Sequence, residues 1–570
     1  MTGVSLADDR SIVKKLELLG LDTKALDDNE TSNAPIFTES VRQHANGVFS
    51  QYGLLGGEVS KLKGVQDVPS AKAAMPFVHF NVKTPSSAFI CGSQGSGKSH
   101  TMNCILENCL IPSDANTLPQ PLTGIVFHFD PFVSDTGGQP CEAAFLSSHR
   151  DVDVRVLCAH TNVRQIKALY RSLPNVHVQE LRLGQKDLNT KRMLDLMAVS
   201  SVQGGGMPLY FHVVTRVLRD LRIEQQKFGG TFQYAAFKRA LDSTELNPGQ
   251  RAPLDQRLDT LESFMATEDV GSGNSLHKKK KGVVTATTWQ PKAGQLTIVD
   301  LSCPCVTADA ACSLFNICLN LFLEQQQQQQ QQVNGPADAS GAGVGRVIAL
   351  DEAHKYMTDS PESAALTESL LSAIRLQRHL GTRVVIATQE PTISPKLLDL
   401  CSISIVHRFT SPDWLATLQG HLAGATPGLA AGGNGDRKVA MADLFGRIVA
   451  LRQGEALLFC PSALVGVMKD RSAGEVKQDG VKEDGVEEED DDDEDEDDDE
   501  DEDDDEDEDD DEDDDEDEDD DEDEDDDEDE EEDGKENTAS TELVPLRQGF
   551  MHIRVRRRIT QDGGRSIMAG

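Results

Sequence analysis

The most chemically specific stretch of the sequence is a glycine-rich run that ends in lysine and serine. It reads GSQGSGKS over residues 92–99 and fits the pattern G-x-x-x-x-G-K-[ST] at every position. Glycines let the backbone curl so that successive N–H groups face phosphates, and a helix that begins here adds partial positive charge. We expect a phosphate-binding loop (P-loop) in which Lys98 reaches the β- and γ-phosphates and the Ser99 hydroxyl binds Mg²⁺. The residues expected to bind the nucleotide are Gly92, Ser93, Gln94, Gly95, Ser96, Gly97, Lys98, Ser99 and His100.

The flanking sequence has the order that such a loop requires. Residues 88–91 are apolar and typical of a strand, and an apolar-periodic stretch follows the loop. A Gly/Ser-rich turn that matched by chance would not lie between a strand and a helix. The context therefore favours a nucleotide-binding loop.

A second constellation is a pair of carboxylates after an apolar run. Residues 346–350 read RVIAL and precede Asp351 and Glu352. Asp351 would hold Mg²⁺ through water, and Glu352 would act as general base on the attacking water. The alternative is an ordinary helix N-cap after a buried strand. Together with the P-loop, the pair predicts that the chain binds ATP and Mg²⁺ and hydrolyses ATP.

Further polar residues stand near these motifs. Gln389 ends the apolar run 382–388 and would contact the γ-phosphate or the attacking water, although a strand-capping amide is the alternative. Arg375 and Arg378 are spaced i, i+3 on a helical pattern and would share a face. Such an arginine can stabilise transition-state charge on a neighbouring subunit, and a solvated helix face is the alternative.

The elements that must position these residues follow from the apolar pattern. From residue 76 onward short apolar runs alternate with helical stretches, which predicts an α/β fold with a central, mainly parallel sheet. The expected strands are residues 88–91, 124–129, 152–157, 296–301, 347–350, 383–387, 402–406 and 456–459.

Composition divides the chain further. Polyglutamine and acidic tracts cannot bury enough apolar surface to fold alone, so both are expected to be disordered insertions at the surface. We expect a loosely structured N-terminal arm over 1–75, an ATPase core over 76–470 with a helical insertion at about 160–290 and a polyGln/Gly loop at 325–345, a disordered acidic insertion over 471–545, and a strand that returns to the core within 546–570.

The formal net charge of −45 comes from one segment. Residues 487–533 are 47 consecutive carboxylates, and the remaining chain holds 54 basic and 52 acidic side chains. The tract suggests a basic protein partner, and a solubilising expansion without a specific role is the alternative. The basic run 277–281 could touch DNA phosphates, act as a nuclear-localisation patch, or be a solvated loop.

Targeting signals are not evident. The first ten residues lack a basic n-region, and no run of about 18 uncharged apolar residues occurs, so we expect no membrane association. The 11 cysteines lack paired CxxC spacing, which is typical of reduced thiols. An intracellular location, nuclear or cytoplasmic, is therefore expected.

The order of these motifs resembles the HerA/FtsK superfamily of P-loop ATPases. Beyond the P-loop, the resemblance rests on IVFHFDPF, LTIVDLS, RVIALDEAHKYM and ATQEPTISPKLLDLCSISIVHRF, and it covers about residues 80–465 and the closing segment. It departs at Glu390, where the superfamily commonly has arginine, and no N-terminal barrel is evident.

The resemblance implies a RecA-like core of the additional-strand, catalytic-glutamate type. It also implies a homo-hexameric ring that moves DNA through its pore, with Arg378 or Arg375 acting in trans. The leading hypothesis is thus an ATP-driven DNA translocase or helicase. The rivals are a nucleotide-dependent switch or scaffold, and a degenerate ATPase derived from a mobile element.

Overall fold

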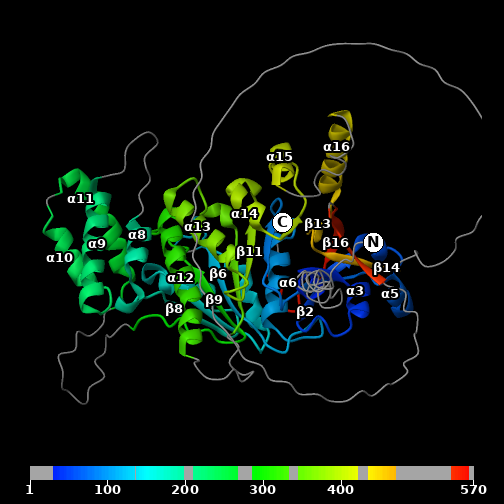
Figure 1. The fold of residues 1–570 in the computed structure, drawn as a ribbon, viewed down its shortest axis with the longest axis horizontal. Coiled ribbons are helices and arrows are strands. Elements are labelled where there is room, and N and C mark those ends of the chain that lie inside the picture. Colours follow the sequence, from blue (N-terminus) through cyan, green and yellow to red (C-terminus); the bar gives the residue numbers. More distant parts are fainter. Residues whose placement is uncertain are drawn as a thin grey trace, which may run out of the picture. The chain divides into compact units, whose positions relative to one another are not determined.

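The strands lie in one sheet whose two halves differ in direction (Figure 1). The computed structural model describes residues 30–134, 137–197, 209–244, 246–266, 285–332, 344–421, 434–469, 541–547 and 549–563. Within them the strand order runs β15-β14-β1-β3-β2-β16-β13-β12-β4-β11-β10-β6-β9-β7-β8, and β5 pairs with β2 off this path. The strands are β1 Ile36–Thr38, β2 Tyr52–Glu58, β3 Phe77–Asn81, β4 Ser87–Cys91, β5 Asn116–Thr117, β6 Thr123–His128, β7 Asp153–Cys158, β8 Val176–Glu180, β9 Gln295–Asp300, β10 Arg346–Leu350, β11 Thr382–Thr388, β12 Ile403–Val406, β13 Glu455–Phe459, β14 Leu464–Lys469, β15 Thr541–Pro545 and β16 Met551–Val555.

The half from β12 to β8 is entirely parallel. Strand β4 leads into the P-loop, β10 leads into Asp351, and β11 lies between them. An additional strand between the P-loop strand and the acidic strand is the arrangement that the resemblance to the HerA/FtsK superfamily implies. The predicted fold class is therefore confirmed, and each of the eight expected strands is present within about one residue of its predicted bounds.

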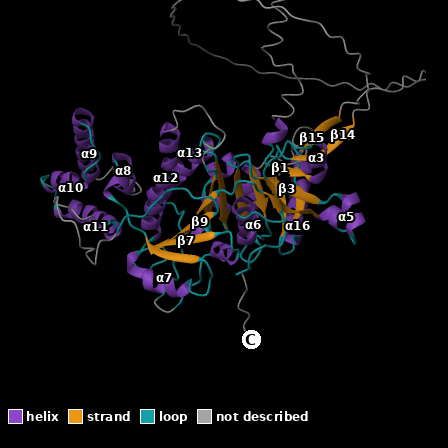
Figure 2. Cartoon of the chain, turned by 90° about the horizontal axis from the view of Figure 1, so that it is seen from below, coloured by secondary structure: helices purple, strands orange, loops and turns teal. Residues whose placement is uncertain are grey.

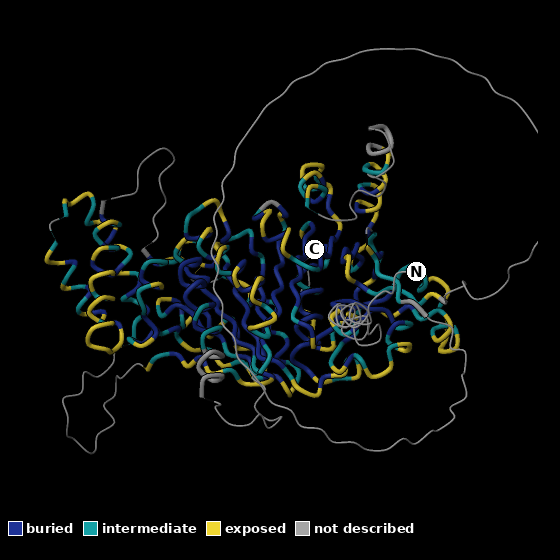
Figure 3. The backbone as a smooth tube through the Cα atoms, in the orientation of Figure 1, coloured by how far each residue is buried: buried dark blue, intermediate teal, exposed yellow. Residues whose placement is uncertain are grey.

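Two apolar cores cover the two faces of this parallel half. Successive side chains of a strand point to opposite faces, so Phe89 and Cys91 of β4 enter one core while Ala88 and Ile90 enter the other. The first core is closed by α12, α13 and α14, and the second by α6 and α7 (Figure 2). Figure 3 shows the strands between them as buried backbone.

Helices connect the parallel strands, because each parallel pair needs a crossover. Their ends carry ordinary caps; the Ser360 side chain, for example, accepts from the Ser363 amide at the start of α13. The helices are α3 Glu39–His44, α4 Val59–Leu62, α5 Val68–Ala74, α6 Lys98–Leu110, α7 Val163–Leu169, α8 Thr190–Met197, α9 Leu209–Phe228, α10 Tyr234–Asp242, α11 Pro248–Phe264, α12 Ala308–Gln332, α13 Pro361–Arg375, α14 Pro395–Leu400, α15 Pro412–His421 and α16 Asn434–Ala450, with short 3₁₀ helices at Glu142–Ser148, His160–Asn162, Gln185–Asp187, Ala353–Lys355 and Pro391–Ile393.

The other half of the sheet, β13-β16-β2-β3-β1, is antiparallel. It corrects the prediction of a loose arm over 1–75. Residues 1–29 lie outside the described residues, but β1 and β2 are strands of this half, and Phe37 is fully buried and stacks on Phe49 at 3.7 Å between ring centroids. The segment is ordered because it pairs with β3 and β16, which a local apolar pattern does not reveal.

Two insertions also differ from expectation. The region 160–290 is not helical throughout, since α7 and β8 extend the parallel sheet before α8 to α11 gather beside α12 (Figure 1). The polyglutamine tract was expected in a loop, whereas α12 continues to Gln332. Glutamine has good helix propensity, and extending an existing helix costs much less than nucleating one.

Several sequence predictions fall on residues that are not described. The acidic run 487–533, the basic run 277–281 and most of the loop 325–345 beyond α12 lie outside the described residues. No helix in the described part of the chain is both long and apolar enough to span a bilayer.

Candidate active site

The P-loop lies at the carboxyl end of β4, as its sequence context predicts. Three of its glycines adopt positive φ, 149° at Gly92, 74° at Gly95 and 117° at Gly97, and α6 begins directly after Gly97, at Lys98. A Cβ at Gly92 would lie 2.7 Å from the Cβ of His407, so no side chain fits there. The backbone turn therefore depends on glycine for both conformation and space.

Lys98 lies beneath this loop and is 4% exposed. Its Nζ donates to the Ser93 carbonyl at 3.0 Å. Burial lowers the pKa of the Lys98 ammonium, although the nearby Glu352 and Asp351 carboxylates act in the opposite direction. A desolvated ammonium surrounded by loop backbone is suited to bind a phosphate that enters the loop.

Ser99 of the P-loop lies close to Asp351, the carboxylate that follows β10. The Ser99 Oγ donates to Asp351 Oδ1 at 3.5 Å, and Asp351 is 2% exposed at the end of β10. Mg²⁺ prefers hard oxygen ligands and keeps several waters, so a hydroxyl beside a carboxylate is a donor set that fits this ion. The fit rests on these two oxygens.

Behind Asp351 lies a pair of residues that sequence reasoning missed. His128 ends β6 and its Nδ1 lies 3.4 Å from Asp351 Oδ2, while Cys141 Sγ lies 3.8 Å from the same oxygen. The ligand atoms of the three residues lie within 4.8 Å of one another, and all three are buried. A thiol and an imidazole are poor Mg²⁺ ligands, so their contacts serve to orient the Asp351 carboxylate.

Glu352 has a strained backbone and a held side chain. Its φ of 49° is unusual for a residue with a Cβ, and such strain persists where the surroundings enforce it. The Gln389 Nε2 donates to Glu352 Oε2 at 2.8 Å, and His354 Nε2 lies 3.5 Å from that oxygen. The structure thus brings Gln389 and Glu352 together on the cavity lining, and Gln389 engages one carboxylate oxygen of Glu352.

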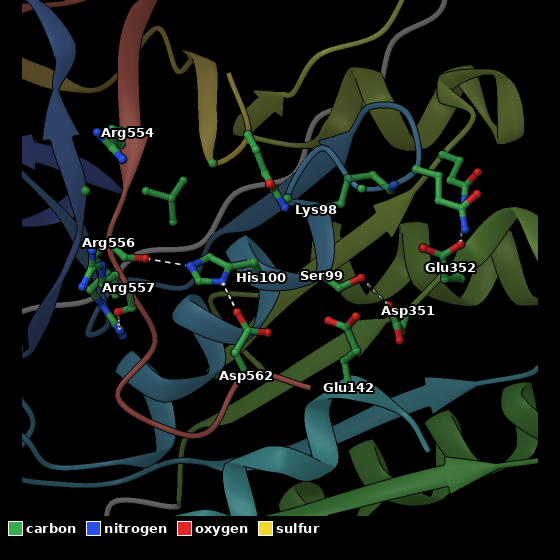
Figure 4. A pocket seen from close by; sticks show the side chains of 18 of the residues that line it. Lys98, Ser99, His100, Glu142, Asp351, Glu352, Arg554, Arg556, Arg557 and Asp562 are labelled. Carbon is green, nitrogen blue, oxygen red and sulfur yellow. Dashed lines mark hydrogen bonds and ion pairs between the residues drawn. The ribbon is translucent and has the colours of Figure 1, made fainter. Parts of the chain in front are cut away.

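These groups line one cavity of about 1170 Å³ (Figure 4). Six of the nine expected nucleotide-binding residues line it, namely Gln94, Gly95, Gly97, Lys98, Ser99 and His100. Gly92, Ser93 and Ser96 are not part of the lining. The cavity also contains Glu142, which sequence reasoning missed. Burial and the charge of Asp351 raise the pKa of Glu142 to about 7. Two carboxyl groups therefore lie near each other in the cavity, and a bound cation would reduce the repulsion between them.

The two predicted arginines are not in this cavity. α13 ends at Arg375, and Arg378 lies in the following turn, so the two do not share a helix face as predicted. Both are exposed and lie shortly before β11, at the sheet edge opposite to the one that holds Gln389. The helical pattern suggested a longer helix than the chain forms.

His407 supports the P-loop from below. Its Nδ1 donates to the Glu455 carbonyl at 2.9 Å, and its Nε2 lies 2.9 Å from the Thr101 hydroxyl. Burial is the main cause that lowers the pKa of His407 to about 4, so the ring is neutral near pH 7. A neutral imidazole thus ties the P-loop helix to β13.

The closing segment, residues 551–563, contains the strand that the sequence predicts to return to the core within 546–570. This strand, β16, lies between β13 and β2 inside the sheet and not at its edge. The side chain of Arg556 is 7% exposed, and its Nη1 lies 2.7 Å from Glu107 Oε2 on α6. Arg554, Arg556 and Arg557 all line the cavity. The arginine-rich sequence by itself does not predict that these side chains line a cavity or pair with a buried glutamate.

No protein-family model matches the sequence, and no curated protein matches it. Among solved structures, VirB4 of Thermoanaerobacter pseudethanolicus aligns over 71% of this chain and 93% of its own, with 11% identity and a TM-score of 0.39.

Two other solved structures are similar over different shares of the chain. The genome packaging NTPase B204 from Sulfolobus turreted icosahedral virus 2 in complex with AMP aligns over 30% of this chain and 62% of its own, with 14% identity and a TM-score of 0.18. The cytoplasmic domain of the Thermomonospora curvata Type VII Secretion ATPase EccC aligns over 72% of this chain and 27% of its own, with 11% identity and a TM-score of 0.25.

Two of these neighbours are an NTPase and an ATPase by name. At these identities and TM-scores they carry no argument about activity. The fold assignment rests on the strand order of this chain, and the function rests on its own cavity.

Proposed function

We propose that this chain is a Mg²⁺-dependent P-loop ATPase. The observation that carries the proposal is the convergence of Lys98, Ser99, Asp351, Glu352 and Gln389 on one cavity, since all five either line it or contact residues that do. These residues come from the carboxyl ends of β4, β10 and β11, where ligands bind in parallel α/β sheets.

The roles of the residues follow from their contacts. Lys98 and the loop amides would bind the phosphates. Ser99 and Asp351 would hold Mg²⁺, which would neutralise charge on the transferring phosphoryl group. Glu352 takes a proton from the attacking water at Oε1, because Gln389 occupies Oε2. His128 and Cys141 keep Asp351 oriented from behind.

The ATPase proposal is tested with the full chain and two substitutions. Lys98→Ala is expected to abolish nucleotide binding, whereas Glu352→Gln is expected to retain binding and to lower turnover by roughly 10²–10⁴-fold. Matched controls are Lys72→Ala and Glu368→Gln, both exposed and outside the cavity. ATP turnover that survives in both cavity variants would exclude this site as the catalytic one.

Within this class we propose a motor that acts on DNA. The support is the motif order from the P-loop to Gln389, which resembles that of DNA-translocating ATPases. We expect single- or double-stranded DNA to stimulate ATP turnover several-fold, and Glu352→Gln to remove the stimulation. Unchanged turnover together with no DNA binding at low salt would contradict the motor and leave the ATPase proposal standing.

A ring-forming motor also requires an arginine in trans, for which Arg375 and Arg378 are the proposed residues. Each Arg→Ala variant is expected to bind ATP normally and to lose most turnover. Mixing either inactive variant with Glu352→Gln protomers is expected to restore part of the activity, because one protomer then supplies the glutamate and its neighbour the arginine. No recovery on mixing would place the arginine outside the catalytic site.

A further inference from the structure

The cavity continues well beyond the phosphate-binding groups. One end, here called the phosphate end, holds Lys98, Asp351 and Glu352. The other end is lined by the antiparallel half of the sheet, with apolar side chains from Leu54, Leu62 and Phe77. Figure 4 shows the acidic pair on one side of Ser99 and His100 and the arginines of the closing segment on the other.

The direction of a bound nucleotide follows from this arrangement. On the proposed function, the γ-phosphate lies near Glu352, because that carboxylate must reach the attacking water. The nucleoside must then extend from the loop toward the opposite end of the cavity. That end is lined by Arg554 and Arg557 of the closing segment.

The closing segment is fixed in place by one buried carboxylate. Glu107 on α6 has a fully buried side chain, and its Oε1 accepts from the Thr560 hydroxyl at 2.6 Å and from the Thr560 amide at 3.0 Å. Its Oε2 accepts from Arg556 Nη1 at 2.7 Å and from the Ile559 amide at 3.1 Å. Through Glu107, helix α6 thus binds the closing segment along its side.

His100, the residue after the P-loop serine, adds a second attachment. Its Nε2 donates to the Arg556 carbonyl at 2.8 Å, and its Nδ1 lies 3.6 Å from Asp562 Oδ2. The closing segment is therefore attached to α6 at its first turn and again at Glu107. The attached segment forms one wall of the cavity.

The four arginines of the segment divide into two pairs. The side chains of Arg556 and Arg558 are 7% and 1% exposed and face Glu107. Arg554 and Arg557 are exposed toward the cavity, and no carboxylate in the described part of the chain forms an ion pair with either. The first pair holds the segment, and the second pair is available to a ligand.

We propose that Arg554 and Arg557 bind the nucleoside of ATP, so that the closing segment forms the base-binding wall of the ATPase site. A nucleobase has apolar faces and a polar edge, which suits a site that combines Leu62 and Phe77 with planar guanidinium groups. The proposal rests on the proposed function, because it places the nucleoside by reference to the phosphate end.

The test measures binding of two probes to the full chain in the presence of Mg²⁺. The probes are ATP and inorganic tripolyphosphate, which keeps the phosphates but lacks the nucleoside. The substitutions are Arg554→Ala, Arg557→Ala and the double variant, with Arg150→Ala as the matched control because its side chain is 91% exposed and outside the cavity.

Each single substitution is expected to weaken ATP binding by about tenfold and to leave tripolyphosphate binding within about twofold of the parent. Equal weakening for both probes would mean that the arginines contact phosphates and would overturn the proposal. Unchanged ATP binding in the double variant would also overturn it. Lys98→Ala separates the ATPase proposal from the base-binding proposal. If ATP and tripolyphosphate both bind the Lys98→Ala variant normally, the phosphate end is not at Lys98 and the ATPase proposal fails.

Loss of folding is excluded by a second measurement. The thermal unfolding midpoint of each arginine variant is expected to match that of the parent, because Arg554 and Arg557 form no ion pair within the described residues. A variant with an unchanged midpoint, weaker ATP binding and unchanged tripolyphosphate binding supports the base-binding wall.

Discussion

The two halves of the sheet contribute to the cavity in different ways. In the parallel half, the catalytic groups follow directly after β4, β10 and β11, so each motif is contiguous in sequence and its neighbour is one strand away. In the antiparallel half, the cavity wall joins β2 and the closing segment, which approach each other only through long-range pairing. The parallel half supplies its cavity residues from short sequence motifs. The antiparallel half supplies its cavity residues only after segments from both ends of the chain have paired.

The largest expected effect comes from the residue that joins the halves. Glu107→Gln is expected to lower the free energy of unfolding by about 3–5 kcal/mol, because it leaves Arg556 and Arg558 buried without a counter-charge. The measurement is chemical or thermal unfolding of the full chain. Glu368→Gln is the control, since its carboxylate is exposed and, among the described residues, forms an ion pair only with Lys396, at 3.6 Å. Equal stability of the two variants would show that the halves do not depend on Glu107.

A second substitution tests the antiparallel half alone. A Cβ at Gly56 of β2 would lie 2.3 Å from the Arg554 carbonyl oxygen, which is backbone and has no room to move. Gly56→Ala is expected to cost about 1–3 kcal/mol of unfolding free energy and to weaken ATP binding. Gly64→Ala is the matched control, because a Cβ there meets nothing within 4 Å. Normal ATP binding in Gly56→Ala would mean that the β2–β16 contact does not shape the cavity.

A pH titration tests the attachment beneath the P-loop. The pKa of His407 is about 4 in the folded chain against an ordinary value of 6.5, so the unfolded chain takes up the proton first as the pH falls. The contribution of His407 to the free energy of unfolding is fully present above pH 6.5 and is lost as the pH falls from 6.5 to 4. At pH 5 this loss is about 2 kcal/mol relative to pH 7.

His407→Gln should remove this part of the pH dependence, because glutamine does not titrate. The measurement is the free energy of unfolding at pH 5 and pH 7 for both proteins. A variant whose stability falls as steeply as that of the parent would assign the acid sensitivity to another group.

The smallest effect is expected from the acidic run. Deleting residues 487–533 is expected to change the unfolding free energy of the core by less than about 0.5 kcal/mol, because 47 consecutive carboxylates bury no apolar surface. Thermal unfolding of the deletion variant gives the measurement. A drop of several degrees would show that the run supports the pairing of the closing segment.

The contrast between the halves also explains what could be predicted from the sequence. Lys98, Asp351 and Gln389 follow buried parallel strands, so each strand gave an apolar run and each motif a fixed place at its end. β2 reads YGLLGGE, which lacks alternation and contains three glycines. Its glycines are required by neighbours, as Gly56 shows, but a local pattern of this kind is typical of loops.

Side-chain partners that are distant in sequence were also beyond prediction. His128 and Cys141 join Asp351 only because β6 lies beside β10. The arginines of the closing segment gave a charge pattern that solvated strands share, and only the contacts with Glu107 distinguish Arg556 and Arg558 from the other two arginines of the segment. Short motifs thus revealed the phosphate end, while the opposite end required the tertiary structure.

The position of β16 also has a consequence for synthesis of the protein. Glu107 and its partner Arg556 are 449 residues apart, so at typical elongation rates of 5–20 residues per second the P-loop helix waits on the order of 20–90 s for its partner. A ribosome that stalls or shifts frame while translating the acidic run 487–533 would release a chain without β16. The sheet of that chain would lack the strand between β13 and β2. Such a product exposes a charged pocket and two unpaired strand edges, which are features that chaperones and proteases act on.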